Sequence, residues 1–422
     1  MPSESLESWT SYIETLNPKE WDLGLERIKP VYSKLINNPL AGKVVVIGGT
    51  NGKGSTVEYL SNLLQSQGKK VGTYTSPHLF CFNERIRING KNCSDQEILN
   101  SFVEVEKSRK SIPLTYFEFS TLAALHLFSL SSLDVVILEV GLGGRLDAVN
   151  VVDSDISILT NVELDHQDWL GNNKETIGKE KADIFRTGKP AILAHKVFPQ
   201  TVYKIASNKG AKVYALKNNF NFLIHKNNKW TYSFKSQEGE VKIKNIKLNN
   251  LSIESASAAL TAFALLGYNL NKELKEVINK TQLEARCQLL GNRFLIDVSH
   301  NPAAALNLKN FITRKFGSTR EIIAILGVMS DKDITGMVKP LRNVINQWYI
   351  TSPNTKRAMK VDTMASKVKE VITSKIIKTP NVKEAVAQAY QNFSQDSLIV
   401  VMGSFYTVSE AVPVIQSILK NK

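Results

Sequence analysis

A glycine-rich stretch with one lysine is the part of the sequence best suited to hold a phosphate group. It follows four β-branched residues and reads Gly48-Gly49-Thr50-Asn51-Gly52-Lys53-Gly54-Ser55-Thr56. Glycines let backbone N–H groups converge on an anion, and a helix starting after the loop would add its N-terminal dipole. A tight turn could also need glycine for a positive φ, but a turn has no use for the lysine. We therefore expect the backbone from Thr50 to Thr56, together with the Lys53 ammonium, to bind a nucleotide.

The loop differs from the usual Walker A pattern at the residue after the lysine. That pattern places a Ser or Thr there, and its hydroxyl holds Mg²⁺. Here the residue is Gly54. A metal ion on the phosphates would therefore need ligands from elsewhere in the chain.

Three polar residues are candidates for that metal, because each lies at or just past the end of an expected strand. They are Ser76, Glu139 and His166. A hydroxyl and a carboxylate suit Mg²⁺, whereas an imidazole is unusual for Mg²⁺ and would tolerate Mn²⁺. Taken alone, Ser76 could shape a turn, Glu139 could cap a helix and His166 could be a satisfied core histidine. Together, at successive strand ends beside a phosphate loop, they predict a metal site.

Two further stretches have plainer interpretations on sequence grounds. The run Gly141-Leu142-Gly143-Gly144-Arg145-Leu146-Asp147 resembles a dinucleotide fingerprint only superficially, and we do not expect a second nucleotide site there. Lys181, in Gly178-Lys179-Glu180-Lys181-Ala182-Asp183, has by itself the pattern of a solvated helix residue.

The elements that must position these residues form an α/β pattern. Apolar runs at 44–47, 133–140 and 156–160 predict buried strands, and helices are expected at 57–64, 95–110 and 114–130. Alternation of this kind implies a parallel sheet with right-handed crossovers. From about 200 to 250 we expect short, polar, antiparallel strands, then a helix near 253–266.

A second strand–helix series begins after an expected linker near 281–291. Its strands are predicted at 293–298, 321–328, 347–351 and 397–402. The expected fold is an α/β P-loop parallel-sheet ATPase domain with a small antiparallel extension, followed by a smaller Rossmann-like α/β domain. The predicted boundaries are 1–282 and 283–422.

Composition limits the possible classes of protein. The chain is 43% hydrophobic and has three widely spaced cysteines, which favours a reducing cytoplasm over a disulfide or zinc scaffold. No apolar run is long enough to span a membrane, and the glutamate-containing first twenty residues predict no signal peptide. The formal charge of +14 is scattered without a basic stripe, which favours a generally solvated lysine-rich surface over a nucleic-acid-binding one. Small anionic ligands such as a nucleotide and carboxylates would also favour a positive field.

The motifs occur in an order that resembles the folylpolyglutamate synthase group of the Mur ligase superfamily. The similarity spans nearly the whole chain and is carried by Gly49–Ser55, Thr75–Leu79, Glu84–Ile86, Glu139–Asp147, Leu164–His166, Glu180–Ala182, Asp297–Pro302, Asp331–Asp333 and Gly403–Phe405. Residues 114–118 and 165–171 are most similar to the bifunctional bacterial members.

The resemblance implies an ATP-dependent ligase. ATP would phosphorylate a pterin-linked carboxylate, the amine of L-glutamate would attack the acyl phosphate, and phosphate would leave as the amide forms. The expected small-molecule partners are ATP, dihydropteroate, folates and L-glutamate. No nucleic acid or membrane partner is expected, and the chain is expected to be a monomer.

The resemblance also assigns roles to residues. Lys53, His166 and Lys181 would be catalytic, with one Mg²⁺ near Ser76 and Glu139 and a second near Glu139 and His166. The family counterpart of Lys181 is carbamylated and helps to hold the second metal. The second domain would close over the nucleotide, and its contributing residues would be Arg286, Asp297 and His300, with Asn301 a weaker candidate. Phe117 would stack on the pterin, although a core aromatic is an equally good interpretation.

Two departures from the family pattern concern the nucleotide. The family usually has Pro-Gly-Arg where this chain has Glu284-Ala285-Arg286, and the family asparagine aligns with Ser255. Serine has a shorter reach and no amide, so the adenosine contact is expected to differ.

Several alternative functions remain open on the sequence. They are a folylpolyglutamate synthase without the second activity, a peptidoglycan-precursor ligase, a nucleic-acid-dependent ATPase and a non-catalytic nucleotide-binding module. The Glu139–Asp147 run and Thr75–Leu79 argue against the peptidoglycan ligase. Glu139, His166 and Lys181 together argue against a module without catalysis.

Overall fold

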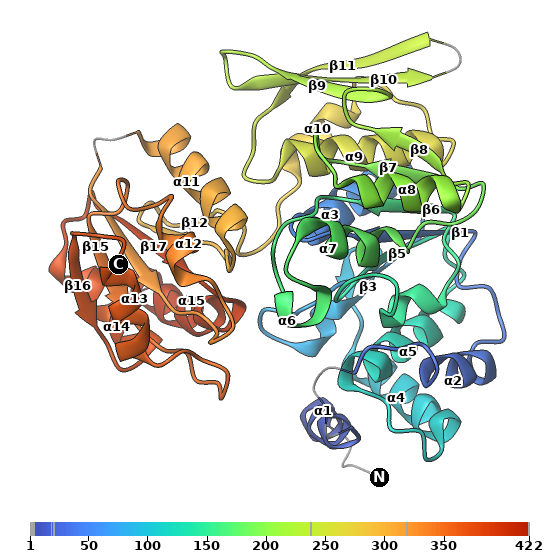
Figure 1. Ribbon diagram of the computed structural model, residues 1–422, viewed down its shortest axis with the longest axis horizontal. Coiled ribbons are helices and arrows are strands. Elements are labelled where there is room, and N and C mark those ends of the chain that lie inside the picture. The colour runs from blue at the N-terminus through green and yellow to red at the C-terminus, as the bar shows by residue number, and fades with distance from the viewer. Residues whose placement is uncertain (1–4, 18, 20–21, 237–238, 318–319, 421–422) are drawn as a thin grey trace. The chain divides into compact units, whose positions relative to one another are not determined.

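The chain divides into two compact units at Thr281 and Gln282. The computed structural model describes residues 5–17, 19, 22–236, 239–317 and 320–420. We call the part up to Thr281 unit 1 and the part from Gln282 unit 2, and each has its own sheet (Figure 1).

An eight-stranded sheet organises unit 1, with the strand order β4-β3-β2-β5-β1-β6-β7-β8. Within this order, each neighbouring pair along β2-β5-β1-β6-β7-β8 is parallel. At the other edge, β3 pairs antiparallel with both β2 and β4. The strands are β1 (Lys43–Gly48), β2 (Val71–Tyr74), β3 (Ile86–Ile88), β4 (Lys91–Asn92), β5 (Val135–Glu139), β6 (Ile156–Leu159), β7 (Pro190–Leu193) and β8 (Lys212–Ala215). The predicted strands β1, β5 and β6 are confirmed, because continuous apolar runs suit strands that are covered on both faces.

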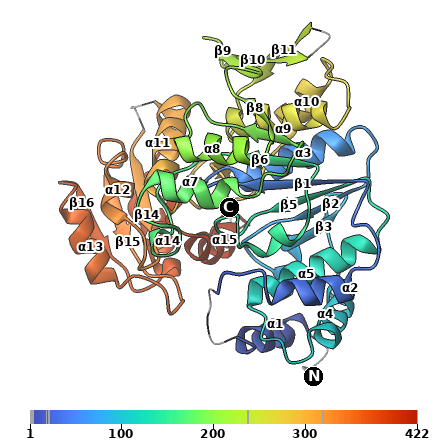
Figure 2. The same ribbon diagram turned by 45° about the vertical axis from the view of Figure 1, so that its right-hand side comes forward.

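Helices cover both faces of this sheet. Figure 2 shows α2, α4 and α5 on one side of β1, β5 and β2, and α3 and α9 on the other. The helices of unit 1 are α1 (Leu6–Thr15), α2 (Ile28–Leu35), α3 (Lys53–Gln65), α4 (Asp95–Arg109), α5 (Tyr116–Ser129), α6 (Gln167–Leu170), α7 (Lys174–Ala182), α8 (Gln200–Asn208), α9 (Ile253–Leu265) and α10 (Leu274–Lys280), with short 3₁₀ turns η1 (Phe82–Arg85) and η2 (Ala148–Val151).

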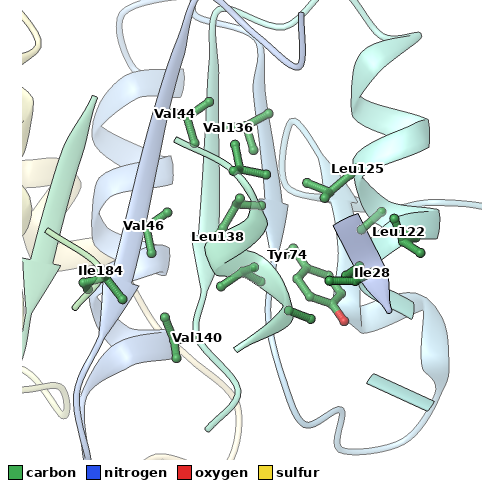
Figure 3. Packing of buried hydrophobic residues seen from close by; sticks show 14 of the residues in the cluster. Ile28, Val44, Val46, Tyr74, Leu122, Leu125, Val136, Leu138, Val140 and Ile184 are labelled. Atoms are coloured by element: carbon green, nitrogen blue, oxygen red, sulfur yellow. The ribbon is translucent and has the colours of Figure 1, made fainter. Parts of the chain in front are cut away.

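The core of unit 1 lies between the central strands and α5. Figure 3 shows Val46 of β1 and Leu138 of β5 on the same side as Tyr74 of β2, facing Leu122 of α5. These four side chains are at most 1% exposed. The core therefore fixes the carboxyl ends of β1, β2 and β5 relative to one another.

The region from 200 to 250 is only partly as predicted. Strands β9 (Phe220–Ile224), β10 (Lys229–Ser236) and β11 (Gly239–Lys247) do form a three-stranded antiparallel sheet. However, Gln200–Asn208 is a helix, and β8 joins the main sheet in parallel. Helix α8 buries only Val202 and Ala206. With so few buried apolar residues, the sequence pattern does not distinguish a helix from an alternating strand.

Unit 2 has a six-stranded sheet with the order β12-β13-β17-β14-β15-β16. All pairs are parallel except β12 with β13. Its strands are β12 (Gln288–Leu290), β13 (Phe294–Ile296), β14 (Ile322–Leu326), β15 (Gln347–Ile350), β16 (Lys375–Lys378) and β17 (Leu398–Met402). Its helices are α11 (Pro302–Phe316), α12 (Ile334–Val338), α13 (Val361–Lys369), α14 (Val382–Asn392) and α15 (Phe405–Lys420).

Part of the expected linker at 281–291 is structured, since β12 pairs with β13. Within the described ranges, no helix has the length and apolar character that crossing a membrane would require.

Candidate active site

The phosphate loop joins the end of β1 at Gly48 to the start of α3 at Lys53. Gly49 has φ 137° and Gly52 has φ 85°, conformations that favour glycine. A Cβ on Gly49 would overlap Oγ1 of Thr160, so the segment that follows β6 approaches the loop too closely for any other residue. Gly49 is therefore required both by its backbone conformation and by the neighbouring Thr160, whereas Gly52 is favoured by its backbone conformation.

The loop places Lys53 and the first amides of α3 together. Nζ of Lys53 lies 3.2 Å from the carbonyl oxygen of Gly49 and 3.3 Å from that of Thr50. The first N–H groups of a helix have no acceptor within the helix, so they are available to an anion. The Thr56 hydroxyl instead donates to the carbonyl of Gly52 over 2.8 Å. The arrangement fits the predicted phosphate cradle.

Glu139 and Ser76 are brought together at neighbouring strand ends. Glu139 is the last residue of β5 and pairs in register with Ile47 of β1. The amide of Ser76 donates to Oε2 of Glu139 over 3.4 Å, and Glu139 is buried. The backbone of Glu139 therefore lies beside the residue that precedes the phosphate loop, and its carboxylate lies beside Ser76.

His166 lies at the start of α6, where its φ is 50°. Its amide donates to Oδ1 of Asp165 over 3.0 Å. In the part of the chain that the structure describes, no three His, Cys, Asp or Glu side chains form a group that could hold a metal ion. A metal here would therefore draw on other donors, such as the Ser76 hydroxyl or a modified lysine.

Lys181 corrects the expectation of a solvated helix lysine. Its side chain is buried, and Nζ donates to the carbonyl of Gly49 in the phosphate loop over 3.1 Å. Burial, followed by the charge of Lys53, lowers the pKa of Lys181 to about 7, whereas Asp165 and Asp147 oppose the shift. Helix α7 packs tightly on the 141–147 loop, since a Cβ on Gly144 would lie 2.9 Å from the Lys181 carbonyl. That long-range packing was not visible in the local pattern.

A pocket lies at the start of α5 and beside the loop that follows β5. Its lining residues are Asp22, Leu23, Gly24, Thr115, Phe117, Glu118, Leu142, Leu146, Asp147 and Ala148. Phe117 is partly exposed and lies so close to Gly141 that a Cβ there would be 2.5 Å from its ring. Phe117 therefore lines the pocket and also packs against the core of unit 1.

Two buried carboxylates shape that pocket. Asp147 accepts the amides of Leu142 and Val149 over 2.8 and 3.0 Å, and burial raises the pKa of Asp147 to about 6. Glu118 accepts the amide of Thr115 over 2.8 Å and pairs with Arg27 over 3.1 Å. Asp147 appeared in the sequence only as the end of a motif.

The Glu84-Arg85 motif has a structural role in the loop after β2. The Glu84 carboxylate accepts the amides of Leu79, Phe80 and Cys81 over 2.6, 2.7 and 2.8 Å. Nε of Arg85 donates to Nδ1 of His78 over 2.8 Å, and burial, then the Arg85 charge, lowers the pKa of His78 to about 4. The motif thus fixes the segment that carries Ser76.

Ser255, the departure from the family pattern, contacts the phosphate loop directly. Its hydroxyl donates to the carbonyl of Gly52 over 3.2 Å. A Cβ on Gly52 would lie 3.0 Å from that hydroxyl oxygen. Serine at this position supports the loop backbone at the start of α3.

Two residues that the sequence reasoning missed also hold the loop. Oδ1 of Asn161 accepts the amides of Thr50 and Asn51 over 3.2 and 2.9 Å. The Thr50 hydroxyl accepts the amide of Glu163 over 3.0 Å. The available signal was their place directly after β6, at the same sheet edge as the other candidates.

In unit 2, Arg286 and His300 lie close to Phe405. The Arg286 guanidinium is 5.2 Å from the Phe405 ring centroid, and the His300 ring is 6.5 Å from it. Nδ1 of His300 lies 3.0 Å from the carbonyl of Val298.

Asp297 fixes the backbone on either side of β13. Its carboxylate accepts the amides of Cys287 and Ser299, each over 2.8 Å. Ala285, which stands where the family usually has the glycine of Pro-Gly-Arg, has φ 54°. Glycine adopts this left-handed conformation more readily than alanine does. Asn301 caps α11 by accepting the amide of Ala304 over 2.9 Å.

Comparison with known proteins gives matches over both units. The chain matches the Mur ligase middle domain over residues 47–292 and the Mur ligase, glutamate ligase domain over 285–405. It is 36% identical over 419 residues to dihydrofolate synthase/folylpolyglutamate synthase of Escherichia coli, covering 98% of this chain and 96% of that protein.

Two solved structures that this chain matches are also of folylpolyglutamate synthase/dihydrofolate synthases. The chain matches E. coli FolC in complex with DHPP and ADP with a TM-score of 0.93 and 36% identity, covering 99% of this chain and all of that one. It matches a bifunctional folylpolyglutamate synthase/dihydrofolate synthase with Mn, AMPPNP and L-glutamate bound with a TM-score of 0.90 and 35% identity, covering 98% of each chain. The chain therefore belongs to the dihydrofolate synthase/folylpolyglutamate synthase family of Mur ligases and is an ATP-dependent ligase.

Proposed function

We propose that this chain joins L-glutamate to dihydropteroate, giving dihydrofolate, and to folates, giving folylpolyglutamates. The observation that carries the proposal is a phosphate loop bordered by buried Glu139 and buried Lys181. The pocket lined by Phe117 and Asp147 is the proposed place for the pterin-bearing acid. The matched relatives that bind ADP, AMPPNP and L-glutamate support the same substrates.

The chemistry is proposed to pass through an acyl phosphate. The substrate carboxylate attacks the γ-phosphorus of ATP, and ADP leaves. The amine of glutamate then attacks the acyl carbon, the C–O bond to phosphate breaks, and the amine loses a proton as the amide forms. Phosphoryl transfer depends mainly on positioned charge. Lys53 and the amides from Gly52 to Ser55 would hold the β- and γ-phosphates.

A divalent metal would be held by Ser76, Glu139 and His166. We propose Mg²⁺ at two sites, one near Ser76 and Glu139 and the other near Glu139 and His166, with Mn²⁺ as a substitute. When bound, the metal ions offset negative charge between the carboxylate and the phosphates. Ser76 and Glu139 fit this role because the Ser76 amide lies 3.4 Å from Oε2 of Glu139 at adjacent strand ends.

Lys181 is proposed to be carbamylated. A pKa of about 7 leaves a substantial share of Lys181 as the neutral amine, which attacks the carbon of CO₂ and releases one proton as the carbamate forms. The carbamate would add an anionic oxygen ligand near the phosphate loop. It would also replace the repulsion between Lys181 and Lys53 by attraction.

Arg286, Asp297 and His300 are proposed to contact the nucleotide from unit 2. Arg286 is held over an aromatic ring, and the backbone around Asp297 is fixed by hydrogen bonds. We further propose that the protein acts as a monomer in the cytoplasm, without a nucleic-acid partner.

Product analysis tests whether both activities are present. Purified protein would be incubated with ATP, Mg²⁺ and L-glutamate, with either dihydropteroate or a reduced folate monoglutamate as the acceptor. Mass spectrometry should detect one added glutamyl residue on each acceptor. Glutamylation of the folate alone would support the monofunctional alternative, and no product with either acceptor would refute the proposal.

A further inference from the structure

The phosphate loop is bound on one side by the segment that follows β6. We call residues 160–163 the backing segment. Its first residue, Thr160, donates its amide and its hydroxyl to the carbonyl of Gly48 over 2.9 and 3.2 Å. The contact that forbids a Cβ on Gly49 is made by this same threonine. The backing segment therefore sets the position where the loop leaves β1.

Asn161 makes the central contacts of the backing segment. Its Oδ1 accepts the amides of Thr50 and Asn51 over 3.2 and 2.9 Å, and its backbone carbonyl lies 3.1 Å from the Thr50 amide. Two donors facing one side-chain atom require that atom to be the oxygen, so the orientation of the side-chain amide is fixed. Both loop amides are consequently directed at Asn161.

Glu163 extends these contacts to the helix that carries Lys181. The Thr50 hydroxyl lies between the Glu163 amide and carbonyl, at 3.0 and 3.3 Å. The Glu163 carboxylate pairs with Lys174, the first residue of α7, over 2.5 Å. Lys181 near the other end of α7 donates to the carbonyl of Gly49. The loop is thus joined to α7 at both ends of that helix.

We propose that Asn161 is a positioning residue for ATP, acting through the phosphate loop. By accepting the amides of Thr50 and Asn51, it orients the loop so that the amides following Gly52 face the phosphates beside Lys53. The same contacts hold the loop in register with α7, and hence with Lys181. This inference rests on the proposed function, since it assigns a role within the same reaction.

Substitution of Asn161 by leucine removes the oxygen and keeps a similar size. The Asn51 amide then loses the Oδ1 acceptor, the Thr50 amide keeps only the backbone carbonyl of residue 161, and the loop is free to tilt. A displacement of about 1 Å at a reacting group can cost roughly 10²-fold. We expect Asn161→Leu to weaken ADP binding by about 10-fold or more in calorimetry and to lower kcat/KM for ATP at least as much. The KM for glutamate should change less than about two-fold.

Asn161→Asp keeps an oxygen that can accept both amides but adds a negative charge near the phosphates. ADP affinity should therefore fall in the order wild type, Asn161→Asp, Asn161→Leu. Equal losses in the two variants would contradict the proposal, because only leucine lacks the acceptor. The aspartate variant also serves as the test if the leucine variant does not fold.

Asn219→Leu is the matched control. Oδ1 of Asn219 accepts the amide of Ala215 over 2.9 Å, after the edge strand β8. The control should lose thermal stability and keep ADP affinity. The proposal is overturned if Asn161→Leu keeps wild-type ADP affinity and kcat/KM for ATP and loses only stability. Failure of the proposed function would look different, since the wild-type protein itself would then form no ADP with acid and glutamate.

Discussion

Lys53 and Glu139 come from different elements beside the phosphates' proposed position, and each is proposed to supply a charge for phosphoryl transfer. Lys53 opens α3, whereas buried Glu139 ends β5. Loss of one preorganised electrostatic group typically costs about 10²–10³-fold in turnover. We expect kcat to fall at least about 10²-fold in Lys53→Ala and in Glu139→Ala.

Lys43→Ala is the control for these variants. Lys43 begins β1, is exposed and forms a 3.5 Å ion pair with Asp155, far along the strand from the loop. The turnover of the Lys43→Ala variant should match that of the wild type in a coupled ADP assay. Turnover within a few-fold of wild type for Lys53→Ala or Glu139→Ala would exclude the assigned role.

The burial of Lys181 predicts a pH-dependent stability. Its folded pKa of about 7 lies below the ordinary value of 10.5, so the unfolded chain binds more protons between these pH values. Stability therefore rises with pH across that window. In CO₂-free buffer without metal, the Tm of the wild type relative to Lys181→Met should rise from pH 7 to pH 10. A constant difference would show that Lys181 is not buried as described.

The proposed carbamylation of Lys181 predicts a chemical rescue. Lys181→Ala should be nearly inactive, and a short carboxylate such as acetate should restore part of its activity by taking the place of the carbamate. Lys179→Ala, in the same helix but exposed, should behave as the wild type. Full activity of Lys181→Ala without acetate would refute a catalytic role for this lysine.

At the scale of elements, the close contact between the backing segment, which follows β6, and the phosphate loop explains Gly49. A side chain there would overlap Thr160, and φ 137° is accessible almost only to glycine. We expect Gly49→Ala to lower kcat/KM for ATP by about 10²-fold, since the loop must move. Gly188→Ala is the control, because Gly188 has φ 69° with no atom within 4 Å of a Cβ. It should lose stability only, and equal activity losses in both variants would contradict the steric explanation.

The elements that the sequence predicted best are those with strong local patterns. Strand β5 is a run of apolar residues buried along its whole length, and α4 starts with a Ser94–Glu97 capping box. The phosphate loop was likewise predictable from its glycines. Strand β16 was missed because it is a short edge strand with lysines at both ends and partly buried residues between them.

The parts that could not be predicted depend on contacts between distant segments. The pocket combines residues 22–24 with the start of α5 and residues 142–148. The burial of Lys181 depends on Gly49, which is 132 positions away in the chain. Asn161 has no motif of its own, and its role follows only from the amides that it accepts. Local periodicity carries no information on such pairings.

At the scale of the whole molecule, the function is proposed to require both units. Unit 2 has its own sheet and core and presents Arg286 over Phe405. Arg286→Ala should raise the KM for ATP about 10-fold through loss of one charge-assisted contact, with little change in Tm. Arg342→Ala, an exposed arginine of the same unit, is the control. An unchanged KM for ATP in Arg286→Ala would remove unit 2's arginine from the nucleotide site.

The central claim is that ATP cleavage is coupled to joining a pterin acid with glutamate. The most direct measurement is ADP release by the purified protein with ATP, Mg²⁺, dihydropteroate and L-glutamate, with each substrate omitted in turn. The account predicts rapid ADP release only when the acid and glutamate are both present. Equal ADP release without the acid, or with DNA in place of both substrates, would contradict it.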